Sequence, residues 1–197
     1  MNTTSRRALS AIAFALLFVL IVRADEKQDS QPRKAEWRIW ASDGRSMQNW
    51  HGQAQLQSLN FERSKRYPWR TEFGFIFSPH IVTQPREWAP YLAGDREDNV
   101  FAGSASLMVR HRFNSDKNFA QPFIEISSGP MWAQRRIPAN TSHFNFISQL
   151  GLGYVFHPQN RASLIVGWRF AHISNGGYAP RNPGLNINSL MIGTRLR

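Results

Sequence analysis

The sequence predicts an all-β protein, an eight-stranded antiparallel transmembrane β-barrel, and three observations support this fold class. From Glu36 onward, apolar residues recur with a period of two, which is the period of a β-strand with two different faces. Several of the strand-like segments are about 9–13 residues long, whereas soluble strands are usually about 5–6 and bilayer-spanning strands about 9–11. No segment after the N-terminal region has the pattern of a long amphipathic or spanning helix, so any membrane crossing must use strands.

Turn-forming residues divide the chain into eight expected strands. These strands are expected near Glu36–Ser42, Gln53–Phe61, Arg70–Pro79, Val100–Phe113, Gln121–Gly129, Phe144–His157, Ala162–Ser174 and Asn186–Arg197. The first turn is expected at Ser42-Asp43-Gly44, because Asp and Gly favour tight turns. A long connection is expected around Gln84–Asn99.

The two faces of these strands differ in size and polarity. In the third strand Phe73, Phe75 and Phe77 oppose Glu72 and Ser78. In the seventh strand a bulky apolar face opposes a face that carries Arg169. An outer-membrane barrel places the bulky face outside and the polar face in a narrow lumen, where Glu72, Glu125, Arg110 and Arg169 would pair. A soluble lipocalin-like barrel or sandwich would show the same alternation with the apolar face inside, so it remains an alternative.

The N-terminal segment predicts export. Arg6 and Arg7 precede an apolar run from Ala8 to Val22, and Ala24 ends a cleavage-site pattern, so residues 1–24 are predicted to be a signal peptide. The alternative is that this segment stays on the protein as an uncleaved N-terminal anchor. Residues 25–35 are expected to be a flexible lead-in, and residues 36–197 the barrel. The seven tryptophans (Trp37, Trp40, Trp50, Trp69, Trp88, Trp132 and Trp168) are expected to belong to the membrane-interface belts.

Charge and composition limit the partners. The 197 residues carry 24 Lys+Arg against 13 Asp+Glu, a net charge of +11, and no Cys. Loss of the three arginines of the signal would lower this charge to +8. Export argues against nucleic acid, so an anionic lipid or phosphate is the expected partner. The scattered histidines His51, His80, His111, His143 and His157 lack metal-ligand spacing, and no metal or other cofactor is expected.

The candidate catalytic residues lie in one segment, Phe170-Ala171-His172-Ile173-Ser174-Asn175-Gly176-Gly177. Residues i and i+2 of a strand share a face, so His172 can act as a general base for the Ser174 hydroxyl. Asn175, Gly176 and Gly177 offer N–H donors for a developing oxyanion. His172 and Ser174 continue the apolar face of their strand, and Asn186 continues the apolar face of the next one. The cluster is therefore expected on the outside of the barrel near its rim, where the substrate is a lipid.

This run, together with Asn182-Pro183-Gly184-Leu185-Asn186, resembles the lipid A 3-O-deacylase family of the PagL type, most closely over residues 168–197. The resemblance implies an outer-membrane esterase that removes an ester-linked 3-hydroxyacyl chain from lipid A. It implies Ser174 as nucleophile, His172 as base, Asn186 as the group that orients the histidine, and Asn175, with Gly176 or Gly177, at the oxyanion hole. The best-known form of the family has a carboxylate at the position of Asn186, and this chain has no Asp or Glu after Glu125.

Seven arginines follow Glu125, and Arg181 lies between the two expected site strands, where it is a candidate contact for a lipid A phosphate. A non-catalytic barrel with a structural or ligand-binding role is the alternative function. The sequence leaves open whether the protein is a monomer or a homodimer.

Overall fold

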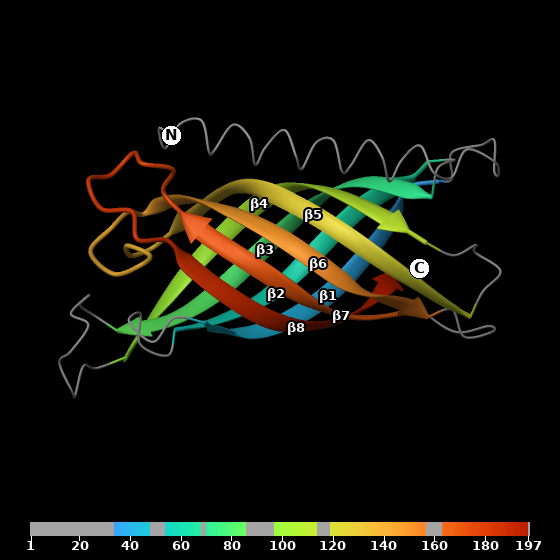
Figure 1. Cartoon of the computed structure of the whole chain (residues 1–197), viewed down its shortest axis with the longest axis horizontal. Coiled ribbons are helices and arrows are strands. Elements are labelled where there is room, and N and C mark those ends of the chain that lie inside the picture. The colour runs from blue at the N-terminus through green and yellow to red at the C-terminus, as the bar shows by residue number, and fades with distance from the viewer. Residues whose placement is uncertain are drawn as a thin grey trace, which may run out of the picture.

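The computed structural model describes residues 34–47, 54–67, 70–85, 97–113, 119–156 and 163–196, and these form a closed eight-stranded antiparallel barrel (Figure 1). Every strand pairs with its sequence neighbours, and β8 pairs with β1 to close the barrel. The predicted fold class is confirmed. The strands are β1 (Glu36–Ser46), β2 (Gln55–Arg66), β3 (Thr71–Pro85), β4 (Glu97–Arg112), β5 (Ala120–Ala133), β6 (Phe144–Phe156), β7 (Leu164–Ser174) and β8 (Leu185–Leu196).

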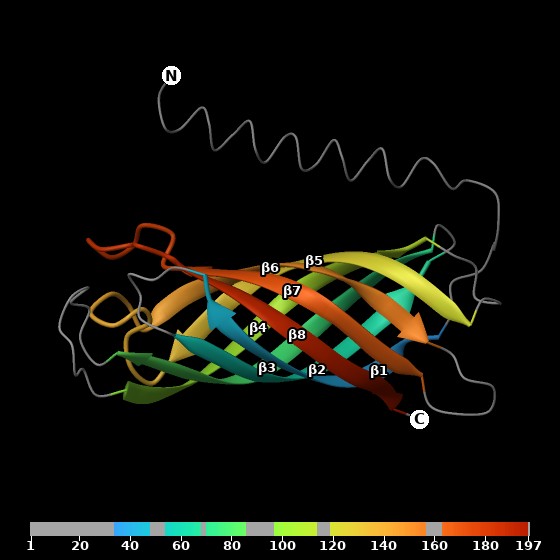
Figure 2. The same ribbon diagram turned by 60° about the horizontal axis from the view of Figure 1, so that its bottom comes forward.

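The two ends of the barrel differ in the length of their connections. The connections β1–β2, β3–β4, β5–β6 and β7–β8 lie at one end and are longer than the three at the other end, where β8 also finishes (Figure 2). Outer-membrane barrels have short periplasmic turns and longer extracellular loops. We therefore call the end with the β7–β8 connection the extracellular end. Within the described ranges, no helix has the length and apolar character needed to cross a bilayer.

The bulky apolar side chains point out of the barrel. Phe73, Phe75 and Phe77 of β3 are 45%, 48% and 53% exposed, whereas Glu72 on the opposite face is 1% exposed. An exposed aromatic band with a charged interior is the arrangement of a lipid-embedded barrel. It excludes the soluble alternative, in which the apolar face would fill the interior.

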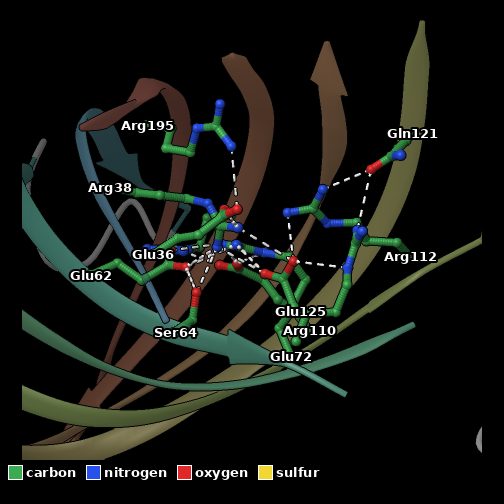
Figure 3. Close-up of polar contacts among 12 residues, drawn as sticks. Glu36, Arg38, Glu62, Ser64, Glu72, Arg110, Arg112, Gln121, Glu125 and Arg195 are labelled. Atoms are coloured by element: carbon green, nitrogen blue, oxygen red, sulfur yellow. Dashed lines mark hydrogen bonds and ion pairs between the residues drawn. The ribbon is translucent and has the colours of Figure 1, made fainter. Parts of the chain in front are cut away.

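The periplasmic half of the lumen is filled by a network of ion pairs, the lumen cluster (Figure 3). Its members are Arg38, Glu62, Glu72, Arg110, Arg112, Glu125 and Arg169. Arg110 Nη2 contacts Glu62 Oε2 at 2.8 Å and Glu125 Oε2 at 2.7 Å, and Arg169 pairs with the other oxygen of Glu125. The predicted pairing of Glu72, Glu125, Arg110 and Arg169 inside the barrel is confirmed.

Trp40 lies inside the barrel, so its assignment to an interface belt is wrong. It is 2% exposed, and the guanidinium carbon of Arg169 lies 3.7 Å from the centre of its ring. A buried guanidinium gains from stacking on an aromatic face, and β1 supplies that face from its inward side. Trp37 and Trp132 do point outward, with exposures of 49% and 62%. The tryptophans at positions 50, 69 and 88 lie outside the described residues.

The extracellular half of the lumen holds a cluster of apolar side chains. Twelve buried residues form this extracellular plug: Ala54, Leu56, Val82, Val100, Met131, Ala133, Ile137, Ile147, Ala171, Ile173, Leu185 and Ile187. Ile137 comes from the β5–β6 connection and is fully buried, so this loop closes the lumen from above. Strands β7 and β8 each contribute two side chains to this plug. Close packing inside the barrel therefore holds the extracellular ends of both strands in place.

The turn expected at Ser42-Asp43-Gly44 is wrong, because the first strand continues through these residues to Ser46. Gly44 faces the lumen at a close approach of β8, where an added Cβ would lie 2.2 Å from Ser189 Oγ and 2.4 Å from the Asn188 carbonyl oxygen. The glycine is therefore explained by strand packing rather than by a turn. Strand β3 likewise extends beyond Pro79 to Pro85.

The signal peptide predicted at residues 1–24 lies outside the described residues, as do most of the lead-in and the centre of the Gln84–Asn99 connection. The domain boundaries therefore stay predictions.

Candidate functional site

The candidate site is built on the outer wall of the barrel, where β7 and β8 approach the extracellular end. His172 of β7 pairs in register with Asn186 of β8, and both side chains lie on the outward face of their strands. His172 Nδ1 lies 2.7 Å from Asn186 Oδ1. A carbonyl oxygen can only accept, so the hydrogen of this bond sits on Nδ1. The other ring nitrogen, Nε2, is left as a proton acceptor.

Ser174 ends β7, two residues beyond His172, and is partly exposed on the same outward face. Its register partner on β6 is Phe146. In the described part of the chain, no hydrogen bond joins the Ser174 Oγ to the imidazole of His172. Catalytic hydrogen bonds of this kind are often long before substrate binds.

The loop between β7 and β8 is organised by Asn175, which is 1% exposed. Its Nδ2 donates to the carbonyl oxygen of Arg181 at 2.8 Å, and its Oδ1 accepts from the N–H of Gly177 at 2.9 Å. Its own N–H donates to Asn182 Oδ1 at 3.1 Å. These three bonds stabilise the loop and leave one N–H of the Asn175 amide and the Gly176 N–H without a hydrogen-bond partner among the described residues.

Gly184 approaches the imidazole ring of His172 closely. The φ angle of Gly184 is +70°, and an added Cβ would lie 2.8 Å from His172 Cε1. Both facts require glycine here, since a side chain would be strained and would press on the ring. Gly177 also has a positive φ, of +90°, but no atom lies within 4 Å of where its Cβ would be.

An open apolar groove of about 590 Å³ begins at His172 and crosses the outer face of β7, β6, β5 and β4. Its lining includes Phe170, Leu150, Ile126, Val109 and Leu107, together with two outward serines. Those serines, Ser128 and Ser148, are register partners and hydrogen bond through their Oγ atoms at 2.9 Å. Small side chains flanked by large apolar ones give a trough that a single acyl chain can fill.

The structure brings His172, Ser174 and Asn186 together on one face, and it places Asn175, Gly176 and Gly177 in the loop directly after Ser174. The side chain of Arg181 is exposed on this loop, and its carbonyl contacts Asn175. Sequence reasoning missed the packing of Gly184 on His172 and the groove. The triplet Asn182-Pro183-Gly184 signalled a turn, but a turn signal does not say which ring the turn approaches.

A known protein family matches most of the chain. The profile of the family described as Lipid A 3-O-deacylase (PagL) matches residues 20–195. The chain belongs to this family. It is 38% identical over 141 residues to the lipid A deacylase PagL of Bordetella bronchiseptica (strain ATCC BAA-588 / NCTC 13252 / RB50), a match that covers 69% of this chain and 73% of the relative.

Two solved structures share the fold. Neisserial surface protein A superposes with a TM-score of 0.61 at 12% identity, covering 84% of this chain and 98% of that one. The outer membrane enzyme PagL superposes with a TM-score of 0.56 at 19% identity, covering 79% and 97%. Family membership confirms the prediction of an ester hydrolase family. Together with the outward apolar face, it also confirms the predicted outer-membrane location.

Proposed function

We propose that this protein removes the ester-linked 3-hydroxyacyl chain from position 3 of lipid A, with Ser174 as nucleophile and His172 as general base. The observation that carries this proposal is the hydrogen bond between His172 Nδ1 and Asn186 Oδ1 on a lipid-facing wall, two residues from an outward serine. A polar cluster facing hydrocarbon is costly, so its presence favours a functional role.

In the proposed reaction, Ser174 Oγ attacks the ester carbonyl carbon while His172 Nε2 takes the hydroxyl proton. The remaining amide N–H of Asn175 and the Gly176 N–H stabilise the negative carbonyl oxygen. Collapse of this intermediate breaks the bond to the sugar oxygen, which takes the proton from Nε2. Water then attacks the acyl-serine, again with His172 as base, and releases the 3-hydroxy fatty acid.

In this proposal the apolar groove binds the acyl chain that is removed. It starts at His172 and is lined by apolar side chains on four strands, so an acyl chain can lie along it while its ester reaches Ser174. Arg181, on the loop beside Ser174, contacts a lipid A phosphate in this proposal, because a guanidinium pairs well with phosphate oxygens.

The direct test incubates the purified full-length protein in detergent with lipid A and analyses the lipid by mass spectrometry. The expected products are lipid A lacking one 3-hydroxyacyl chain and the free 3-hydroxy fatty acid. Lipid A that stays intact over a range of pH and detergents would favour the non-catalytic barrel.

The Asn186→Asp variant should hydrolyse lipid A faster than the wild type, by roughly ten-fold in kcat. A carboxylate accepts the Nδ1 hydrogen as the amide does, and it also stabilises the imidazolium that forms when His172 takes the proton. Asn186→Ala, which removes the acceptor, should lower kcat. The two rates are measured from fatty acid release, and an aspartate variant no faster than the alanine variant would contradict the orienting role.

The Gly184→Ala variant should lose activity by roughly ten- to one hundred-fold, because its methyl group displaces the His172 ring from its position. Gly103→Ala is the control, since a methyl group at this position of β4 lies outside the β7–β8 loop and meets no atom within 4 Å. An equal loss of activity in both variants would show that displacement of the ring does not explain the effect.

A further inference from the structure

The outer surface beside the candidate site carries one arginine that the catalytic proposal does not use. Arg45 lies near the end of β1, on its outward face, and its side chain is exposed. It pairs in register with Asn188 of β8 on one side and with Gln55 of β2 on the other. Arg45 makes no hydrogen bond or ion pair with any described residue, unlike the paired arginines of the lumen cluster.

Register places Arg45 close to the site. Asn188 lies two residues from Asn186 on the same face of β8, and the N–H of Met47 donates to the Asn186 carbonyl oxygen at 3.1 Å. With about 4.8 Å between strands and about 3.4 Å per residue, the Cα atoms of Arg45 and His172 are roughly 12 Å apart. A long arginine side chain and a sugar headgroup can together span this distance.

Two neighbouring groups define what Arg45 can bind. Asp43, on the same face of β1, accepts a hydrogen bond from Gln55 Nε2 at 2.7 Å and makes no ion pair with Arg45. The Asn188 Oδ1 atom is buried without a hydrogen-bond partner. A guanidinium that no described carboxylate neutralises, at the rim of a lipid-facing wall, suits an anionic group.

We propose that Arg45 binds a phosphate of the lipid A headgroup from the β1 side of the site, while the acyl chain lies in the groove on the β6 side. This inference rests on the proposed function. The guanidinium presents two parallel N–H donors to two phosphate oxygens. Arg45 thereby positions the ester over Ser174 and does not touch the reacting atoms.

The test uses full-length protein in detergent micelles, with Ser174→Ala as the parent so that binding is measured without turnover. Arg45→Gln in this parent should bind bisphosphorylated lipid A about ten-fold more weakly, and Arg45→Lys should keep part of the affinity. The difference between parent and variant should vanish for lipid A from which both phosphates have been removed. Arg63→Gln is the matched control, because Arg63 is an exposed outward arginine of β2 that stacks over Trp37.

With Ser174 restored, Arg45→Gln should raise KM and leave kcat nearly unchanged. Equal binding by Arg45→Gln and its parent overturns the proposal, and so does an equal loss with phosphorylated and dephosphorylated lipid A. Competition by phosphatidylglycerol as strong as that by lipid A would assign Arg45 to membrane phosphates in general and overturn the specific role. If the wild type fails to deacylate lipid A, the proposed function fails, and the binding comparison still decides the role of Arg45.

Discussion

Replacing Ser174 or His172 by alanine should lower the rate of lipid A deacylation by at least about a thousand-fold, because in the proposed mechanism each change removes the nucleophile or the base. The double variant should be little slower than either single variant, since nucleophile and base act as one unit. Loss of the 3-hydroxyacyl chain is followed by mass spectrometry, with purified barrels at equal concentration.

The fold does not depend on these two side chains, which lie on the outer wall. Both variants should therefore unfold at the same denaturant concentration as the wild type. His143→Ala serves as the histidine control, because His143 stacks on Trp132 in the β5–β6 region. Normal deacylation by Ser174→Ala and His172→Ala would refute the assignment of the site.

The Glu125→Gln variant should lower the free energy of unfolding by roughly 3–5 kcal/mol, which is the typical cost of removing one partner of a buried ion pair. Glu125 binds Arg110 with one oxygen and Arg169 with the other, and its side chain is 1% exposed. The neutral amide would leave two guanidinium groups in the lumen without that charge. The free energy of unfolding is measured by urea titration in micelles, with tryptophan fluorescence as the signal.

Glu36→Gln is the matched control for Glu125. Glu36 also pairs with an arginine, Arg38, but its side chain is 32% exposed at the periplasmic mouth, so water replaces the lost contact. Its loss should cost about 1 kcal/mol or less. Similar effects at the two positions would mean that the lumen cluster is more hydrated than its burial indicates.

The alternation of side chains predicted strands with two different faces, and strand length and the export signal favoured the membrane barrel over a soluble one. Parity along a strand assigns every second residue to one side, which is why the sequence alone could assign His172 and Ser174 to a common face. Alternation did not show which face points into the barrel. The burial of Glu125 and Arg169 in the structure decides that the charged face points inward.

Features that depend on contacts between distant segments could not be predicted in this way. Gly44 looks like a turn residue in the sequence, and only the approach of β8 explains it. Trp40 shares the inward face of Arg38 on β1, but its partner there, Arg169, comes from far along the chain. The contact between Gly184 and His172 likewise depends on the path of the loop, which local patterns do not specify.

The filled interior also bears on the permeability barrier of the cell. Buried side chains of the lumen cluster and of the extracellular plug occupy the interior between the described strands, so we expect no wide aqueous channel like that of a porin. A cell that inserts many copies should not become more sensitive to small water-soluble toxins, as it would with a porin.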